Sequence, residues 1–176
     1  MEAGFGLDLI TFRDAGPDDA GAMAALGRES FTETFGHLYT PENLAAFLEN
    51  HSEDGWRAEL SDPRFAVRLG QADGRAVSYG KLGPPSLPFE VKGPTIELRQ
   101  LYVLKPWQGA GVAPSLMEWA LAESRRRGAR QIYLSVFVDN PRARRFYERY
   151  GFTPVGRYDF MVGSHADEDI IMRLKL

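Results

Sequence analysis

The sequence predicts one mixed α/β domain built around a single sheet. Strand-like and helix-like runs follow one another as strand, two or three helices, β-hairpin, strand, helix, strand, helix and a closing pair of strands. No repeat, low-complexity segment or convincing linker interrupts this order. A chain of 176 residues is also long enough for one domain with a sizeable core. We therefore expect a single domain over residues 1–176.

Composition excludes several classes of protein. The apolar content of 44% and the charged content of 26% are ordinary for a soluble globular chain, and the net charge of −3 gives no general reason to bind nucleic acid or an anionic membrane. The absence of cysteine excludes disulfides, thiolate metal sites and a cysteine nucleophile. The three histidines lie in unrelated loops, so no metal site is expected. The start MEAGFGLDLI lacks a basic, apolar leader, and no stretch approaches the roughly 20 apolar residues of a spanning helix. We therefore expect a cytoplasmic protein.

The first half of the chain is predicted to hold a strand, three helices and a hairpin. Pro17 and two aspartates suit the start of the first helix, and Thr40 followed by Pro41 suits the start of the second. The turn formers QADG separate two strand-like runs and predict a hairpin. The stretches expected, in order, are the strand LDLITFR, the helices GPDDAGAMAALGRESFTETF, TPENLAAFLEN and SEDGWRAELSD, the hairpin RFAVRLG–RAVSYGKLG and the proline-rich loop PPSLPFEVKGP.

The second half is predicted to alternate strands and helices before a final antiparallel pair. Gly128 stops one helix, while Asn140 with Pro141 begins the next and Gly151 ends it. The expected stretches are the strand TIELRQLYVL, the helix VAPSLMEWALAESRRR, the strand QIYLSVFV, the helix NPRARRFYERY and the strands FTPVGRYDF and EDIIMRLKL.

One of these strands has an irregular pattern. Ile96 and Leu98 share a face, so Gln100 should be the next inward residue, yet the apolar positions resume at Leu101 and Val103. Side chains alternate strictly along a strand, so a slip of one residue at Arg99–Gln100 predicts a β-bulge. The other interpretation is an exposed edge strand with an irregular pattern. A glycine-rich turn just downstream favours the bulge, because a bulge frees backbone groups for a site.

That turn, PWQGAGVAPS, joins the irregular strand to a helix. It is either a simple tight turn or a bare backbone that an anion can approach, since a helix N-terminus offers unpaired N–H groups. A Walker loop would need a lysine after Gly111, and a dinucleotide fingerprint would need a third glycine where Pro114 stands. The pattern that fits is Q-x-x-G-x-A, through Gln108, Gly111 and Ala113.

These residues resemble the GNAT acyltransferase superfamily, whose acetyl-CoA signature is [RQ]-x-x-G-x-[GA]. A second motif, N-x-x-A-x-x-x-Y-x-x-x-G-F, follows in the family's order within LSVFVDNPRARRFYERYGF. The resemblance covers about residues 95–155, and the earlier part matches in the order of its elements. It implies a single mixed-sheet fold with a bulged central strand and flanking helices. Pro114 departs from many relatives because proline has no N–H to face a pyrophosphate.

The resemblance implies acetyl-CoA as co-substrate. Its pyrophosphate would lie on the glycine turn, its pantetheine arm would run along the bulged strand, and Asn140 would contact the arm. The residues expected to bind it are Leu101, Tyr102, Val103, Gln108, Gly109, Ala110, Gly111, Val112, Ala113, Asn140, Ala143 and Phe146. Three arginines nearby, Arg142, Arg144 and Arg145, either meet the ribose phosphate or form an ordinary solvated helix face.

Acetyl transfer to an amine needs a base, an oxyanion partner and a proton donor. An amine with a pKa near 10 costs roughly 4 kcal/mol to deprotonate at neutral pH. For this base we select Glu97, just before the bulge, although such a residue is as often an exposed strand residue. An amide near Leu101 or Tyr102 could stabilise the oxyanion. By resemblance Tyr147 donates a proton to the thiolate; by its helical spacing alone it would be a core aromatic.

The acceptor is predicted from short matches only. The stretches ESFTETFGHLYTPENLAAFLEN and DFMVGSHADEDIIM are similar to bacterial polyamine acetyltransferases of the PaiA type. That similarity implies that Glu33 and Asp159 bind a cationic small-molecule amine, although Glu33 could equally be a solvated helix residue. Two alternatives remain open: a protein N-terminus or lysine as acceptor, and a non-catalytic module that binds CoA. A homodimer is also possible.

Overall fold

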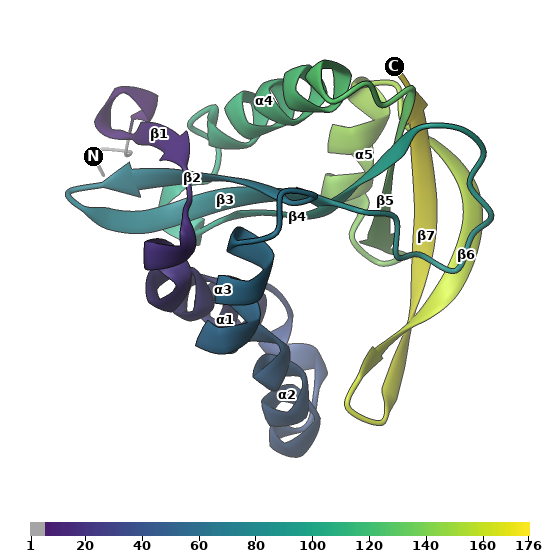
Figure 1. The fold of residues 1–176 in the computed structure, drawn as a ribbon. Coiled ribbons are helices and arrows are strands. Elements are labelled where there is room, and N and C mark those ends of the chain that lie inside the picture. Colours follow the sequence, from purple (N-terminus) through teal and green to yellow (C-terminus); the bar gives the residue numbers. More distant parts are fainter. Residues whose placement is uncertain (1–5) are drawn as a thin grey trace.

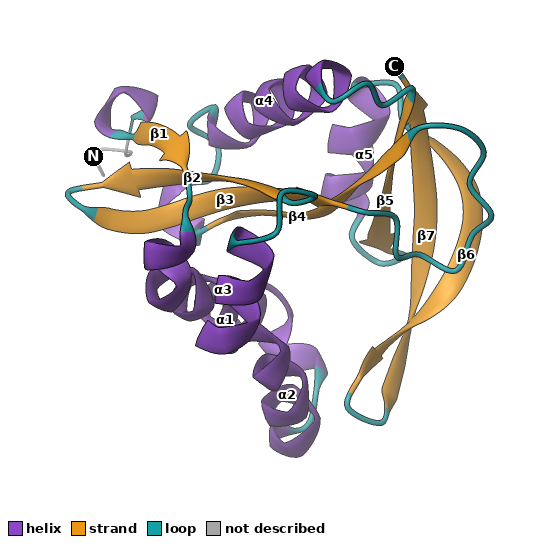
Figure 2. Ribbon diagram, in the orientation of Figure 1, coloured by secondary structure: helices purple, strands orange, loops and turns teal. Residues whose placement is uncertain are grey.

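The computed structural model describes residues 6–176, which form one seven-stranded mixed sheet with helices on both faces (Figures 1 and 2). The strand order is β1-β2-β3-β4-β5-β7-β6, in which only the β4–β5 pair is parallel. The strands are β1 (Thr11–Asp14), β2 (Ala66–Ala72), β3 (Arg75–Gly83), β4 (Thr95–Val103), β5 (Gln131–Phe137), β6 (Thr153–Val162) and β7 (His165–Lys175). The helices are α1 (Ala20–Phe35), α2 (Pro41–Leu48), α3 (Glu53–Leu60), α4 (Val112–Arg126) and α5 (Pro141–Arg149). The predicted mixed α/β class and its element order are confirmed.

Helix ends follow local signals in the sequence. The Thr40 hydroxyl accepts the Asn43 amide at 3.2 Å, and the Asn140 side chain accepts the Ala143 amide at 3.3 Å. Gly128 and Gly151, with φ of 81° and 96°, end α4 and α5 in the left-handed region that favours glycine. These caps were predicted and are confirmed.

Two predicted boundaries in the first half are wrong. The stretch LDLITFR opens with a 3₁₀ turn at Leu7–Leu9, and the strand begins only at Thr11. Thr11 already pairs with Gln71, close to the end of β2, so earlier residues have no neighbouring strand to join. The hairpin turn is Asp73–Gly74 rather than QADG, because both residues have positive φ and Ala72 pairs directly with Arg75.

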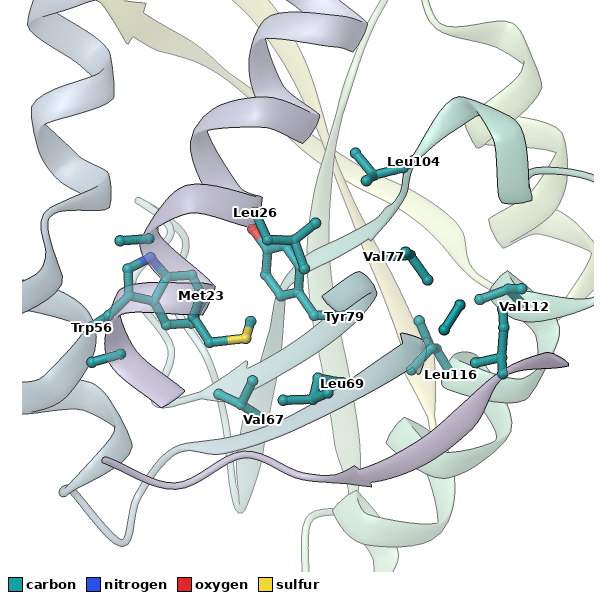
Figure 3. Close-up of a cluster of buried hydrophobic side chains, with 14 residues drawn as sticks. Met23, Leu26, Trp56, Val67, Leu69, Val77, Tyr79, Leu104, Val112 and Leu116 are labelled. Atoms are coloured by element: carbon teal, nitrogen blue, oxygen red, sulfur yellow. The ribbon is translucent and has the colours of Figure 1, made fainter. Parts of the chain in front are cut away.

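The helices divide the sheet's two faces between them. In Figure 1, α4 and α5 lie on one side, and α1, α2 and α3 lie on the other. Figure 3 shows the cluster in which α1 and α3 pack onto the sheet, with Met23, Leu26 and Trp56 around the fully buried Tyr79. A second cluster joins α4 and α5 to β5 and β7 through residues such as Met117, Ile132, Leu134 and Met172.

The predicted bulge in β4 is confirmed. Gln100 pairs with Lys81 and Leu98 pairs with Leu82, which leaves Arg99 as the extra residue without a partner on β3. The extra residue reverses the side-chain alternation, which explains why the apolar pattern resumes at Leu101.

Strands β4 and β5 separate soon after they meet. They pair only from Thr95–Glu97 to Gln131–Tyr133, and beyond these three pairs no β4–β5 pairing is recorded within the described residues. The unpaired part of β4 therefore turns one backbone edge towards an opening in the sheet.

A buried histidine joins α1 to α3 and predicts an acid-sensitive fold. His51 is 3% exposed, its Nδ1 accepts the Trp56 indole N–H at 3.3 Å, and a Cβ on Gly27 would lie 2.3 Å from that Nδ1. Burial, aided by Lys81 and Arg28, lowers the pKa of His51 to about 4. The folded state therefore binds fewer protons than the unfolded state, so this stability is complete above the unfolded pKa and is lost as the pH falls towards 4.

We expect His51→Gln to remove an acid-sensitive part of the stability. The wild type should exceed the variant in free energy of unfolding at pH 7, and this gap should shrink by up to about 3 kcal/mol between pH 6.5 and 4. Urea unfolding of both proteins across this range measures the gap. Two parallel curves would contradict the role given to His51.

Candidate active site

A cavity of about 810 Å³ lies where β4 and β5 separate. Its walls come from the free part of β4, the ends of β5 and β7, the glycine turn, α5, β6 and the α1–α2 region. A cavity of this size suits a small-molecule or cofactor site.

One end of the cavity is the glycine turn that begins α4. Gly109 and Gly111 have φ of 82° and 87°, and Gly111 is the N-cap residue of α4 with no side-chain cap. The amides of Val112 and Ala113 begin the helix without intrahelical partners, while Pro114 has no N–H to offer. The turn thus presents backbone donors and the positive end of the helix dipole to the cavity.

Cations gather at this same end. Arg142 lies beside the turn and Lys105 directly precedes it in the chain, while Arg99 and Arg149 are also among the lining residues. Arg142 donates to the Gln108 side chain at 3.2 Å, and Gln108 in turn donates to the Val103 carbonyl at 2.9 Å. Gln108 therefore links the glycine turn to β4, and this end of the cavity suits an anionic group such as a pyrophosphate.

Almost all the residues predicted to bind acetyl-CoA line this cavity. They are Leu101, Tyr102, Val103, Gln108, Gly109, Gly111, Val112, Ala113, Asn140, Ala143 and Phe146. Ala110 does not line it, because its side chain packs against the hydrophobic core beneath the turn. Arg142 lines the cavity as well, whereas Arg144 and Arg145 do not.

Tyr147 projects from α5 into the middle of the cavity. Its ring packs against Phe146 and Phe152, and its hydroxyl has no hydrogen-bond partner among residues 6–176. Burial raises the pKa of Tyr147 to about 12, so the phenol stays protonated at neutral pH. It can therefore act as a hydrogen-bond donor to a group bound beside it.

The opposite end of the cavity is acidic, through two residues that the sequence pattern did not single out. Asp167 and Asp169 lie two positions apart on β7, so both face the cavity, and they are only 7% and 6% exposed. Asp167 accepts a short hydrogen bond from the Tyr39 hydroxyl, and its other oxygen lies 3.0 Å from His165 Nε2.

Asp169 has no such cationic or N–H partner among the described residues. Burial, helped by the charge of Asp167 and opposed by the Ser135 hydroxyl, raises the pKa of Asp169 to about 7. The signal in the sequence was a D-x-D pattern in the last strand, which puts both carboxylates on one face and Ile170 and Met172 on the other.

Aromatic rings surround this acidic end. Phe31 stacks on Phe47 with ring centres 4.1 Å apart, Phe47 meets Phe160 edge-on at 5.5 Å, and Phe35 meets Phe137 at 6.4 Å. All five rings line the cavity. An apolar wall with two buried carboxylates favours a ligand that is cationic and also carries hydrocarbon.

The structure does not bring Glu97 into the cavity. Its carboxylate is 6% exposed and accepts the amides of Ser86 and Leu87 at 2.8 and 3.2 Å and the Ser86 hydroxyl. It does not line the cavity, but holds the β3–β4 loop against the sheet. The position before the bulge was predicted correctly, but the loop that covers it was not.

The two predicted acceptor residues also differ from expectation. Glu33 lines the cavity, yet its carboxylate accepts the Lys105 amide at 2.9 Å and so fixes the segment that follows β4. Asp159 is exposed and pairs across the hairpin with Glu168, on the face of β6 away from the cavity. Its neighbour Phe160 pairs with Asp167 and faces inwards.

Within the part of the chain that the structure describes, no three histidine or carboxylate side chains cluster closely enough to hold a metal ion. None of the helices described is both long and apolar enough to cross a bilayer.

Comparison with known proteins identifies the family. The sequence profile of the acetyltransferase (GNAT) family matches residues 26–152. The chain belongs to the GNAT family. An uncharacterized N-acetyltransferase of Mycobacterium tuberculosis is 34% identical over 157 residues, which cover 88% of this chain and 96% of that protein. A second uncharacterized N-acetyltransferase, from Lactobacillus delbrueckii subsp. lactis, is 29% identical, and the match covers 90% of this chain and 92% of that protein.

Solved GNAT structures share the fold. The PaiA N-acetyltransferase of Thermoplasma acidophilum, in complex with coenzyme A, superposes with a TM-score of 0.75 at 20% identity and covers 95% of this chain and 99% of its own. A ribosomal-protein-alanine N-acetyltransferase of Brucella melitensis gives a TM-score of 0.66 at 24% identity, and the match covers 94% of this chain and 99% of that one. The GNAT fold expected from the two motifs is thus confirmed, and the protein is an acetyl-CoA-dependent N-acetyltransferase.

The proline at the start of α4 gives a test of the glycine turn. Pro114→Ser restores an N–H in the first turn of α4, at a position that lines the cavity. We expect CoA to bind tighter by about 1 kcal/mol, or roughly fivefold in Kd, from one added hydrogen bond to a charged group. Titration calorimetry measures the change. Equal or weaker binding would mean that the amide at position 114 does not face the phosphates.

Proposed function

We propose that this GNAT enzyme transfers the acetyl group of acetyl-CoA to a primary amine of a small molecule. The observation that carries the proposal is the opposite charge of the two ends of one cavity. The backbone amides of the glycine turn, Lys105 and Arg142 lie at one end, and Asp167 and Asp169 of β7 lie at the other; Arg99, Arg149 and Glu33 line the cavity as well. An anionic cofactor and a cationic acceptor would therefore meet between them, beside Tyr147.

The residues of the cationic end fit the cofactor. The positive φ of Gly109 and Gly111 leaves the turn without Cβ atoms where a pyrophosphate would approach, and the free amides of Val112 and Ala113 point the same way. Acetyl-CoA supplies the acetyl thioester and the thiolate leaving group. The unpaired edge of β4 from Leu101 to Val103 would hold the amides of the pantetheine arm.

Two groups of this chain would assist the bond changes. A β4 amide near Leu101 or Tyr102 would donate to the carbonyl oxygen as negative charge develops there, because the bulge and the strand separation leave that edge without a partner strand. Tyr147 would donate to the departing sulfur. With a pKa near 12 the phenol keeps its own proton well, so its main contribution is a hydrogen bond to the thiolate.

The size of the acceptor is limited by contacts across the acidic end. Asn43 on α2 accepts the amide and hydroxyl of Ser164 at 3.0 and 3.1 Å, Tyr39 donates to Asp167, and Phe47 packs on Phe160. These contacts join the α1–α2 region to the β6–β7 hairpin. A polypeptide would have to part them in order to pass through, which supports a small amine over an internal lysine of a protein.

A di- or polyamine is the finer form of this proposal. Residues two apart on a strand are separated by about 7 Å, so Asp167 and Asp169 could each meet one ammonium group of a short diamine. The aromatic wall would cover the methylene groups between them. Asp167 and Asp169 take over the role that the sequence resemblance assigned to Glu33 and Asp159.

Replacement of Tyr147 by phenylalanine tests the proton donor. We expect Tyr147→Phe to lower kcat by about 10²–10⁴-fold with little change in the affinity for acetyl-CoA, because the phenol acts only as the thiolate leaves. Steady-state kinetics and calorimetry measure the two quantities. Tyr150→Phe is the matched control, since Tyr150 lies on the same helix outside the cavity. Near wild-type turnover in Tyr147→Phe would make Tyr147 a core aromatic.

An acceptor panel tests the proposed function itself. We expect thiol release from acetyl-CoA to be fastest with 1,4-diaminobutane and spermidine, slower with propylamine, and slowest with N-acetyl-lysine and a tripeptide that has a free N-terminus. The acidic end would bind a second ammonium group but has no room for a chain. A faster reaction with the tripeptide would favour an N-terminal acetyltransferase, and CoA binding without any thiol release would favour a binding module.

A further inference from the structure

Asp169 lies at the point where four elements of the cavity meet. It faces Ser135 of β5 and lies close enough to Tyr39, Tyr102 of β4 and Tyr158 of β6 to raise the pKa of each of these phenols. Tyr147 acts on Tyr102 in the same way. Asp169 and Tyr147, the expected proton donor, therefore both lie near Tyr102.

The other carboxylates in and near the cavity already accept hydrogen bonds from groups of the protein. Glu33 accepts the Lys105 amide, and Glu97 accepts two amides and a hydroxyl of the β3–β4 loop outside the cavity. Asp167 is bound by the Tyr39 hydroxyl and by His165. Of the cavity carboxylates in residues 6–176, Asp169 alone meets neither a cation nor an N–H donor, so its lone pairs remain available to a ligand.

We propose that Asp169 is the general base that accepts the proton from the acceptor's ammonium group. This inference rests on the proposed function, because it requires an amine acceptor. It places the base on β7, at the acidic end, instead of at Glu97 on β4. In this step Asp167 is a positioning residue that acts on Asp169 through its negative charge, besides attracting the second ammonium group of a diamine.

The proton balance of this step is complete. Asp169 takes one proton from the ammonium, and the freed nitrogen lone pair forms the bond to the acetyl carbon while the carbon–sulfur bond breaks. The nitrogen loses a second proton as it becomes an amide, and that proton ends on the sulfur with the help of the Tyr147 hydroxyl. Asp169 then releases its proton to water, which leaves the enzyme unchanged.

The surroundings of Asp169 suit this role. The groups that face it are the phenols Tyr39, Tyr102 and Tyr158, the Ser135 hydroxyl and the carboxylate of Asp167, which itself faces His165. Burial and Asp167 raise the pKa of Asp169 from 3.8 to about 7. A carboxylate at that pKa accepts a proton from an amine about 10³-fold more favourably than an ordinary one, and it is still largely ionised just above neutral pH.

The pH dependence of turnover tests the proposal, with 1,4-diaminobutane and propylamine as acceptors. We expect wild-type kcat/KM to rise with pH through a limb near 7, because Asp169 must lose its proton. Asp169→Asn should lower kcat by about 10²–10⁴-fold and abolish the limb. Asp167→Asn should move the limb to lower pH, because one negative charge is removed. Glu168→Gln is the control: Glu168 lies between the two aspartates but pairs with Arg157 on the outer face.

Thermal unfolding supplies a readout that needs no acceptor. A folded-state pKa above the unfolded value means that this carboxylate weakens the fold increasingly as the pH rises from 4 to 7. Asp169→Asn should therefore have a Tm higher than wild type by roughly 10 °C at pH 8 and little changed at pH 4. Glu168→Gln should show no such pH-dependent gain. A folded, more stable and inactive Asp169→Asn variant would separate loss of the base from loss of the fold.

Each failure has a distinct signature. Asp169→Asn with wild-type turnover, or a limb that disappears in Glu97→Gln and persists in Asp169→Asn, would overturn Asp169 as the base. If the Tm of Asp169→Asn at pH 8 is equal to or lower than that of the wild type, burial does not raise the pKa of Asp169. No thiol release by the wild-type enzyme with either amine would instead contradict the proposed function.

Discussion

The early separation of β4 from β5 is the constraint on which the rest of the structure depends. Two parallel strands that paired along their full length would leave no opening, because neighbouring strands lie only about 5 Å apart. Here three residue pairs hold them together, and the hydrophobic cluster beneath α4 and α5 closes the sheet behind the gap. The unpaired edge of β4, the glycine turn and the end of β7 all reach one cavity because of this divergence.

The parts that sequence reasoning placed well are those fixed by neighbouring residues. Thr40 and Asn140 cap helices that begin next to them, and the phase slip at Arg99 gives the bulge because alternation is a local property. The glycine turn is local as well, since the positive φ of Gly109 and Gly111 serves a strand and a helix that adjoin it. The sequence could therefore predict that nearly all the residues at the cationic end of the cavity come together.

The acidic end of the cavity could not be predicted in this way, because it is assembled from segments far apart in the sequence. The D-x-D pattern indicates that Asp167 and Asp169 share a face, but only the pairing with β5 and β6 decides that this face is the cavity. Asp159 lies one position from an inward residue, and that single step puts it on the opposite face of the sheet. Glu97 lies outside the cavity for another reason. A loop ten residues before it folds back, and the amides of that loop donate to the Glu97 carboxylate.

The joint between α2 and the β6–β7 hairpin has a consequence for how this enzyme can diverge. The two sides of the joint, Tyr39 to Phe47 and Phe160 to Asp167, meet through side chains, and neither belongs to the segment from β4 to α5 that holds the cofactor end. The family profile also ends at residue 152, before β6 and β7 begin. Substitutions at the joint would therefore change the acidic end of the cavity and leave the glycine turn intact. The two ends of the cavity can in this sense change independently of each other in evolution.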